Sequence, residues 1–599
     1  MKNSKPTFSS RWDILVHYLS PQKWRVVLMA VALLGAIGFQ LVGPQILARF
    51  IDTAVADSVA SQLLTLAFLY IGVALVEQTL RVISVYGAST IGWTATNNLR
   101  ADLATHCLQL DMGFHKNRTP GELIERVDGD VTTLSRFFSQ FTVIIVGNSI
   151  LMLGVVVALF FVHPLAGLGC LIFTVIALGV MLRLRNIAVP YYAAYRQEAA
   201  RFYSFATEQL TGREDIKANG ARPFFMRQLF EINQDWMLVW HKARLASTTL
   251  WASSTGMFAL GSIAALAIGA YLFNRELITI GMVFLIFNYF NQLIFPIQQI
   301  REEIELLQQA DASMERIRDL FNEESRIDQG GTGQVAGQAF KVEVSDISFH
   351  YGRGAKDKEA ADWVLQNVNF ALEPGQTLGV LGRTGSGKST LARLLLRMYD
   401  PQKGQIQLNG VSLPNVPLGD LRQRIGYVTQ DVQIFQATVR DNVTFFDDQV
   451  SDEKLINLFA QLGLEEWLSR LPGGLDTLLG TDGGTLSAGE AQLLAVARVF
   501  LKDPGLVILD EASSRLDPAT EQFMTQAVNQ LFNRRTGIII AHRLATLETV
   551  DQIMVMQDGA VTEFGRRDEL AADADSRFAQ LLRAGTIDLP ASSNGSEQI

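Results

Sequence analysis

The chain has 599 residues, of which 48% are hydrophobic and 19% are charged, and its formal net charge is −9. A chain of this length exceeds what one hydrophobic core supports, so we expect several domains or one domain with a membrane region. The negative charge and the lack of a basic tract argue against a nucleic-acid partner. Cys107 and Cys170 form no disulfide framework and have no metal-ligand spacing, so we expect two buried, unreactive side chains.

Apolar stretches dominate the first half of the chain. Residues 1–24 are polar and basic around the amphipathic WDILVHYL, which predicts a helix at the cytoplasmic membrane surface. Residues 25–322 then predict a membrane domain of six long transmembrane helices, because a bilayer-crossing helix needs about 20 apolar residues. The spans lie near Val26–Phe50, Leu63–Ile91, Phe141–Val162, Leu165–Leu184, Leu245–Phe273 and Leu277–Phe295.

Two of the links between these spans are rich in lysine and arginine. Cytoplasmic loops carry this excess, so we expect both links, both termini and the later domain on the cytoplasmic side of a cell (inner) membrane. The links continue the helical pattern over Trp93–His115 and Asn186–Gly212, and each then reaches a segment broken by glycine or proline. We expect short transverse helices there that dock on a partner surface, with solvated loops as the alternative.

Polar side chains interrupt several spans. Glu77 and Arg81 are spaced to pair as i and i+4 in the second span. Other polar residues in the spans are Gln40, Gln45, Gln78, Asn288, Asn291 and Gln292. A water-lined cavity or hydrogen bonds between helices would satisfy them, and the sequence does not separate these possibilities.

The composition changes after the sixth span. Residues 323–339 form a Gly-rich polar stretch that we interpret as a linker. Residues 340–583 have the mixed polarity of a soluble α/β domain, which begins with the alternating strand VEVSDISF. We expect the polar tail, residues 584–599, to be disordered.

The segment from Thr377 to Thr390, TLGVLGRTGSGKST, predicts a strand, a phosphate-binding loop and the start of a helix. Glycines let the backbone N–H groups point at phosphate oxygens, the lysine contacts the outer phosphates, and the hydroxyl of Ser389 can bind Mg²⁺. We therefore expect binding of ATP. The predicted phosphate-binding residues are Gly382, Arg383, Thr384, Gly385, Ser386, Gly387, Lys388, Ser389 and Thr390.

Further candidate residues lie at the ends of other predicted strands. Asp510 and Glu511 end the strand GLVILDE, where Asp510 would hold Mg²⁺ and Glu511 would act as the general base toward water. Gln430 follows another strand and can reach both Mg²⁺ and the water. His542 would orient the terminal phosphate, and Tyr351 can stack on the adenine base.

These motifs carry a family resemblance. Tyr351, GRTGSGKST, Gln430, LSAGE, VILDE, SRLD and AHR occur in the order and rough spacing of an ABC transporter nucleotide-binding domain, a P-loop ATPase with a helical subdomain. The six preceding spans resemble the membrane domain of the exporter type. The resemblance implies that two such domains face each other, so that Ser487 and Gly489 act on the ATP of the opposing subunit. One chain is then a half-transporter.

The signature segment LSAGE departs from the family pattern LSGGQ at two positions. Ala488 replaces a glycine, which is strained only if its φ is positive, and Glu490 places a carboxylate near a phosphate-binding loop. Some heterodimeric exporters have an altered signature in one chain, so both a heterodimer and a homodimer fit the sequence.

The resemblance implies an ATP hydrolase coupled to transmembrane transport. We expect an exporter or flippase of amphipathic or hydrophobic compounds or lipids, which works by alternating access in the lipid bilayer. An ATP-gated membrane regulator or channel is the alternative from another class. Export of peptides or siderophore-like compounds is the alternative within the same class.

Overall fold

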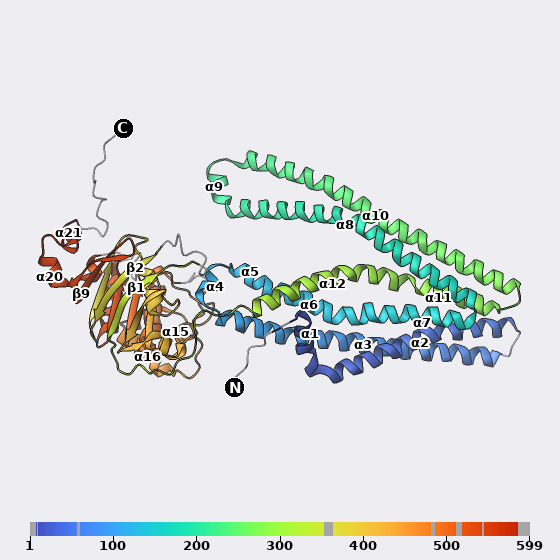
Figure 1. The fold of residues 1–599 in the computed structure, drawn as a ribbon, viewed down its shortest axis with the longest axis horizontal. Helices are drawn as coiled ribbons and strands as arrows, with labels where there is room; N and C mark the ends of the chain where they lie inside the picture. The colour runs from blue at the N-terminus through green and yellow to red at the C-terminus, as the bar shows by residue number, and fades with distance from the viewer. Residues whose placement is uncertain are drawn as a thin grey trace. The chain divides into compact units, whose positions relative to one another are not determined.

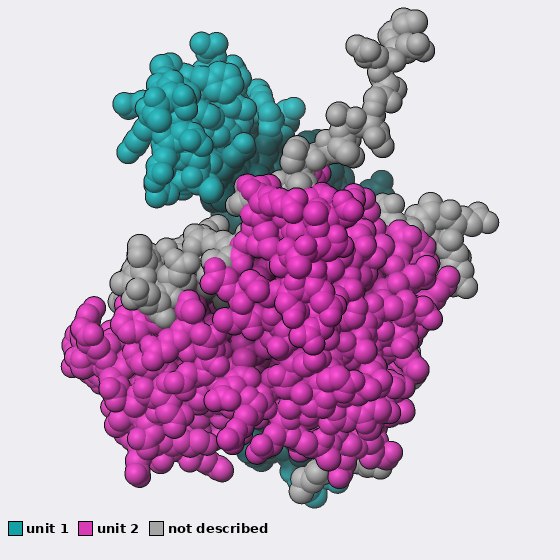
Figure 2. All heavy atoms as spheres, turned by 90° about the vertical axis from the view of Figure 1, so that its left-hand side faces the viewer, with its two compact units in different colours: residues 1–109, 119–324 teal, residues 110–118, 325–599 magenta. Residues whose placement is uncertain are grey.

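The computed structural model describes residues 8, 10–56, 60–352, 363–480, 486–510, 518–541 and 544–584. Contacts within the chain divide it into two compact units, which Figure 2 colours separately. Unit 1 comprises residues 1–109 and 119–324, and unit 2 comprises residues 110–118 and 325–599. The predicted tail lies outside the described residues from residue 585 on.

Unit 1 is entirely helical in its described residues (Figure 1). Its first elements are α1 (Arg11–Leu19), α2 (Lys23–Val55), α3 (Ala60–Gln109), α5 (Pro120–Ile124), η2 (Glu125–Asp130), α6 (Val131–Arg136) and η3 (Phe137–Val146). They are followed by α7 (Gly147–Val162), α8 (Pro164–Thr211), α9 (Arg213–Ala218), α10 (Arg222–Asn274), α11 (Ile280–Gln292) and α12 (Ile294–Phe321). The segments η2 and η3 have π-helical hydrogen bonding.

Six helical stretches of the described chain are long and apolar enough to cross a membrane, which confirms the six predicted spans. They are Asp13–Val55, Ala60–Gln109, Pro120–Val162, Pro164–Thr211, Arg222–Asn274 and Ile280–Ile300. Several extend well beyond their apolar windows, as the helical pattern of the links predicted. Cys107 and Cys170 are both buried, also as expected.

Short helices occur where the sequence predicted them. α9 joins the long helices α8 and α10, which run side by side (Figure 1). The ring of Trp236 on α10 stacks on Phe202 and Tyr195 of α8, with centroids 5.0 and 6.1 Å apart. In the other link, α3 ends at Gln109 and not at His115, and α4 (Met112–Lys116) begins after a two-residue break.

One contact fixes the end of α2 against the start of α11. Oδ1 of Asp52 accepts a hydrogen bond from the backbone N of Gly281 at 2.7 Å, and Oδ2 accepts one from the Thr279 hydroxyl at 2.6 Å. The backbones are so close that a Cβ on Gly281 would lie 2.1 Å from the carbonyl oxygen of Ala48. Glycine is therefore required where these two helices meet.

Unit 2 contains two sheets. A four-stranded antiparallel sheet has the order β2-β1-β4-β5, and a six-stranded sheet has the order β10-β9-β3-β8-β7-β6, in which only β10 is antiparallel to its neighbour. The strands are β1 (Val342–Phe349), β2 (Leu365–Leu372), β3 (Thr377–Leu381), β4 (Lys403–Leu408), β5 (Val411–Ser412), β6 (Ile425–Val428), β7 (Leu506–Asp510), β8 (Thr536–Ile540), β9 (Gln552–Gln557) and β10 (Ala560–Arg566).

Helices cover and extend these sheets. They are α4, α13 (Lys388–Leu395), α14 (Leu418–Arg424), α15 (Val439–Thr444), α16 (Asp452–Gln461), α17 (Glu465–Arg470), α18 (Ala488–Lys502), α19 (Pro518–Phe532), α20 (Arg567–Ala572) and α21 (Arg577–Ala584). Every residue of β7 and β8 is buried, as expected for central parallel strands. α15 to α18 surround a second core and form the predicted helical subdomain.

The segment interpreted as a linker belongs largely to unit 2. Ile327 and Val335 are buried in the core of the sheets. The chain is fixed just before β1, because the Thr536 hydroxyl donates to the Phe340 carbonyl at 2.7 Å and accepts from the Phe340 backbone N at 3.1 Å. The Gly-rich segment before β1 is therefore held in a defined position against the sheets.

We predict that Gly281→Ala lowers stability by about 1–3 kcal/mol, because the methyl group forces α2 and α11 apart. Thermal unfolding of the purified full chain measures the effect. Gly72→Ala in α3 is the matched control, since no heavy atom lies within 4 Å of a Cβ built there. Equal melting temperatures for the two variants would contradict the close contact.

Candidate nucleotide site

The loop between β3 and α13 has the backbone of a phosphate-binding loop. Gly382, Gly385 and Gly387 all have positive φ, at 150°, 87° and 98°. A Cβ on Gly382 would lie 2.3 Å from the carbonyl oxygen of Met556, and one on Gly387 would lie 2.5 Å from the side chain of Leu365. The curvature of the loop therefore requires glycine at these positions.

Two side chains inside this loop fit a phosphate ligand. Lys388 is only 6% exposed, and its ammonium donates to the carbonyl oxygens of Gly382 and Arg383 at 2.6 and 3.0 Å. The buried hydroxyl of Ser386 has no hydrogen-bond partner among the described residues. A buried cation and an unsatisfied hydroxyl at a helix N-terminus are the groups that phosphate oxygens would satisfy. Ser389 and Thr390 follow in the first turn of α13.

Asp510 lies at the carboxyl end of β7, close to the sheet edge where the loop begins. The strands β3, β8, β7 and β6 are parallel, so their carboxyl ends share one edge. Asp510 is buried, and its Oδ2 accepts a hydrogen bond from the Tyr427 hydroxyl at 3.2 Å. Burial, followed by the charge of Asp510, raises the pKa of Tyr427 well above its usual value, so this hydroxyl stays a donor.

The other predicted catalytic residues are placed only in part. Gln430 is exposed in the loop that follows β6, at the same edge as Asp510. Glu511 and His542 lie outside the described residues, as does the SRLD segment.

Tyr351 is held beside α13. Its hydroxyl lies 2.9 Å from the Thr390 hydroxyl and accepts a hydrogen bond from Nη1 of Arg393 at 3.1 Å. The ammonium of Lys116, at the end of α4, lies 3.5 Å from the centroid of the Tyr351 ring. These contacts fix the ring that the sequence assigned to adenine stacking.

Sequence reasoning missed the contact of α4 with Tyr351. α4 is fastened by Asp111, whose Oδ1 accepts from the backbone N of Phe114 at 3.1 Å and whose Oδ2 accepts from that of Arg326 at 2.8 Å. The signal was present in the sequence, because Lys116 lies in the link that was predicted to dock. Only the fold shows that its docking surface includes Tyr351.

The signature segment forms the N-terminus of α18. Ser487 is the N-cap, with its hydroxyl accepting from the backbone N of Glu490 at 3.2 Å, while the Glu490 carboxylate accepts from the backbone N of Ser487 at 2.7 Å. The indole N–H of Trp467 donates to the other carboxylate oxygen at 2.9 Å. Glu490 is thus held by two donors and completes a capping box.

The substitution at Ala488 causes no backbone strain. Ala488 is the first residue of α18 and is not among the described non-glycine residues with positive φ. The sequence left open whether Ala488 adopts a positive φ. Because its φ is negative, the methyl group adds almost no backbone strain. Gly489 is buried in the first turn of the same helix.

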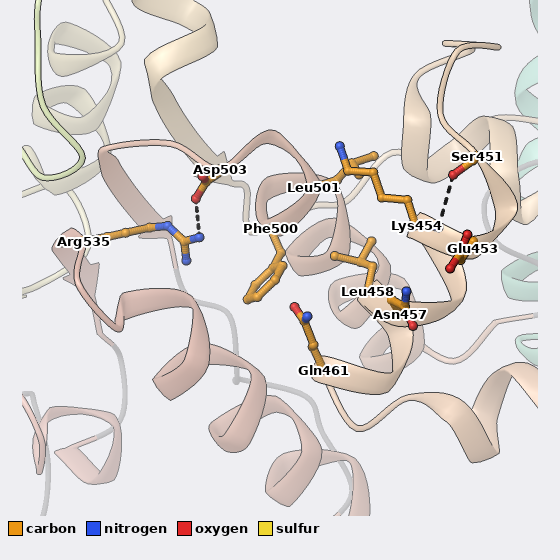
Figure 3. Close-up of a pocket in the computed structure, with 10 residues that line it drawn as sticks. All are labelled: Ser451, Glu453, Lys454, Asn457, Leu458, Gln461, Phe500, Leu501, Asp503 and Arg535. Atoms are coloured by element: carbon orange, nitrogen blue, oxygen red, sulfur yellow. Dashed lines mark hydrogen bonds and ion pairs between the residues drawn. The ribbon is translucent and has the colours of Figure 1, made fainter.

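A separate surface pocket of about 610 Å³ lies between α16, the end of α18 and Arg535 (Figure 3). An ion pair between Asp503 and Arg535 lies at one side of it. None of the residues predicted to bind nucleotide lines this pocket. The predicted nucleotide-binding residues therefore lie away from this pocket.

Two family models match the chain. The model described as "ABC transporter transmembrane region" matches residues 26–297, and the model described as "ABC transporter" matches residues 365–514. The chain belongs to the ABC transporter superfamily. Its fused membrane and ATPase regions make it an exporter-type half-transporter, and its ATPase domain couples ATP hydrolysis to transport.

Known proteins resemble this ABC transporter over most of its length. It is 27% identical to the ATP-dependent lipid A-core flippase of Alkalilimnicola ehrlichii, covering 96% of this chain and 98% of that protein. It is 29% identical to a fatty acid ABC transporter of Mycobacterium bovis, over 79% and 74% of the two chains. The structure of a bacterial Atm1-family ABC exporter with ATP bound has the same fold, with a TM-score of 0.78, 23% identity and coverage of 94% and 98%.

We predict that Lys388→Ala weakens ATP binding by at least about tenfold, because the loop loses its buried cation. Equilibrium binding of ATP to the full chain measures this. Lys454→Ala, which removes an exposed lysine from α16 of the same unit, is the matched control. Unchanged affinity in the Lys388 variant would contradict the role of this loop.

We also predict that Glu490→Ala destabilises the first turn of α18 by about 1–2 kcal/mol, because the capping box and the acceptor of Trp467 are both lost. Hydrogen exchange of the amides at residues 488–491 measures this directly. Glu490→Gln keeps one acceptor oxygen and should keep most of the protection. Equal exchange in the alanine variant and the unmodified chain would show that the cap is unimportant.

Proposed function

We propose that two copies of this chain form an ATP-driven exporter or flippase of amphipathic or hydrophobic compounds, including lipids. The main support for this pairing is a difference between the two short helices of the links, α4 and α9. α4 packs on unit 2 of its own chain, through Asp111 and Lys116. α9 instead has exposed or half-exposed residues throughout and contacts α8 within its own hairpin. A second chain would supply the surface that α9 lacks.

The signature segment supports a homodimer over a heterodimer. In the family arrangement, Ser487 and Gly489 of one chain complete the ATP site of the other. This chain presents them at a capped helix N-terminus with no strain at Ala488. The geometry of residues 486–490 therefore favours pairing of two copies of this chain.

Each residue of the site has a role in this mechanism. Lys388 and the loop amides would bind the phosphates of ATP, and Tyr351 would stack on adenine. Ser389, Gln430 and Asp510 would hold Mg²⁺, which neutralises charge on the phosphates when bound. Glu511 would take the proton of the attacking water, and His542 would orient the terminal phosphate.

Transport would follow from closure of the two ATPase domains. ATP between them brings the domains together, and the docked helices α4 and α9 transmit the movement to the membrane helices. The cavity then changes from inward facing to outward facing, and hydrolysis resets it. The ATPase domains would lie on the cytoplasmic side of the cell membrane, because the basic links lie there. The names of the lipid A-core flippase and the fatty acid transporter support an amphipathic substrate.

We expect Glu511→Gln to bind ATP normally but to hydrolyse it at least about a hundredfold more slowly, since the general base is lost. Phosphate release by the chain in nanodiscs measures hydrolysis, and native mass measures the dimer. Glu466→Gln, on the exposed face of α17, is the control. A monomer that hydrolyses ATP at full rate would overturn the proposal.

A further inference from the structure

A polar layer crosses the middle of unit 1. On α3, Glu77 and Arg81 precede Ser84 and Ala88 at spacings of three and four residues, and Ser84 and Ala88 are 1% and 2% exposed. Residues at this spacing share one face of a helix. Glu77 and Arg81 therefore lie on the same side of α3 as Ser84 and Ala88, within an apolar span.

The layer joins three helices. Nη2 of Arg81 donates to Oε1 of Gln40 on α2 at 2.9 Å and to Oε1 of Glu77 at 3.1 Å. Nε2 of Gln292, at the end of α11, donates to the backbone carbonyl of Gln40 at 3.4 Å. Next to it, the hydroxyl of Tyr289 donates to the carbonyl of Leu41 at 2.7 Å.

The layer is incompletely satisfied. Both contacts of Arg81 use Nη2, and within the described part of the chain no hydrogen bond is found for its Nη1 or Nε. The Arg81 side chain is 44% exposed, against 23% for Glu77. Oε1 of Gln292 is buried and likewise has no partner among the described residues. In a membrane, such groups need water or a polar ligand.

We propose that Arg81, oriented by Gln40 and Glu77, binds the anionic group of the transported amphiphile, a carboxylate or a phosphate. The Nη1 and Nε N–H groups of Arg81 lie on different edges of the guanidinium, and each can donate one charge-assisted hydrogen bond to an anionic oxygen. Glu77 balances the charge when no substrate is present and is less exposed than Arg81. The accessible charge is therefore positive, which favours an anionic ligand over a cationic one. This inference rests on the proposed transport function and adds the chemical class of its substrate.

Binding without nucleotide tests this directly. The probes are three compounds with the same twelve-carbon tail: dodecyl phosphate, dodecyl maltoside and dodecyltrimethylammonium. We expect the full chain in nanodiscs to bind dodecyl phosphate about tenfold more tightly than the other two. Inorganic phosphate at the same concentration should not compete, because the site needs the tail as well.

Variants then assign the preference to Arg81. Arg81→Gln should abolish the tenfold preference, and Arg81→Lys should keep part of it. Glu77→Gln should strengthen binding of dodecyl phosphate, since a like charge is removed. Arg275→Gln, in the link between α10 and α11, is the matched control and should change nothing.

Equal affinity of the unmodified chain for the three probes would overturn the proposal, as would a preference that survives Arg81→Gln. In that case Arg81 only joins α3 to α2 through Gln40. Competition by inorganic phosphate alone would assign the site to a free anion and would also overturn it. Because no nucleotide is present, this result is independent of ATP turnover, which tests the proposed transport function separately.

Discussion

The close backbone approach of the loop after β3 is the constraint on which the rest of unit 2 depends. The loop can curl only because Gly382 lies against the carbonyl of Met556 on β9 and Gly387 lies against β2. The same curl buries Lys388 and leads directly into α13, whose Thr390 and Arg393 hold Tyr351. The same short stretch of backbone therefore forms the predicted phosphate-binding loop, packs against the sheets, and leads to the residues that hold Tyr351, which α4 contacts.

Much of this architecture could be predicted from the sequence. The six spans are long apolar runs, and the phosphate-binding loop combines a strand, fixed glycine spacing and a helix, so local pattern identifies both. The contacts of Lys116 with Tyr351 and of Trp467 with Glu490 could not be predicted, because each joins segments that only the fold brings together. The packing of Ile327 and Val335 in the core could not be predicted either, because both lie in a Gly-rich stretch among polar neighbours.

The effect of the departures in the signature segment depends on the local geometry of the chain. Glutamate beside a phosphate site suggests repulsion, but here its carboxylate accepts from the Ser487 backbone and from the Trp467 indole. Those bonds hold the negative charge in fixed positions at a helix N-terminus, where it is favourable. The same reasoning applies to Arg81 and Glu77, whose cost in lipid is reduced by pairing but not removed.

The burial of both cysteines has a practical consequence for following the motion of this transporter. Cys107 and Cys170 are 6% and 0% exposed, so neither thiol is accessible to a bulky maleimide dye in the folded chain. A new cysteine on α9 would then be labelled selectively, without removing either native residue. Fluorescence energy transfer between two such labels in the proposed dimer would follow, in real time, how far the two α9 segments move during ATP hydrolysis.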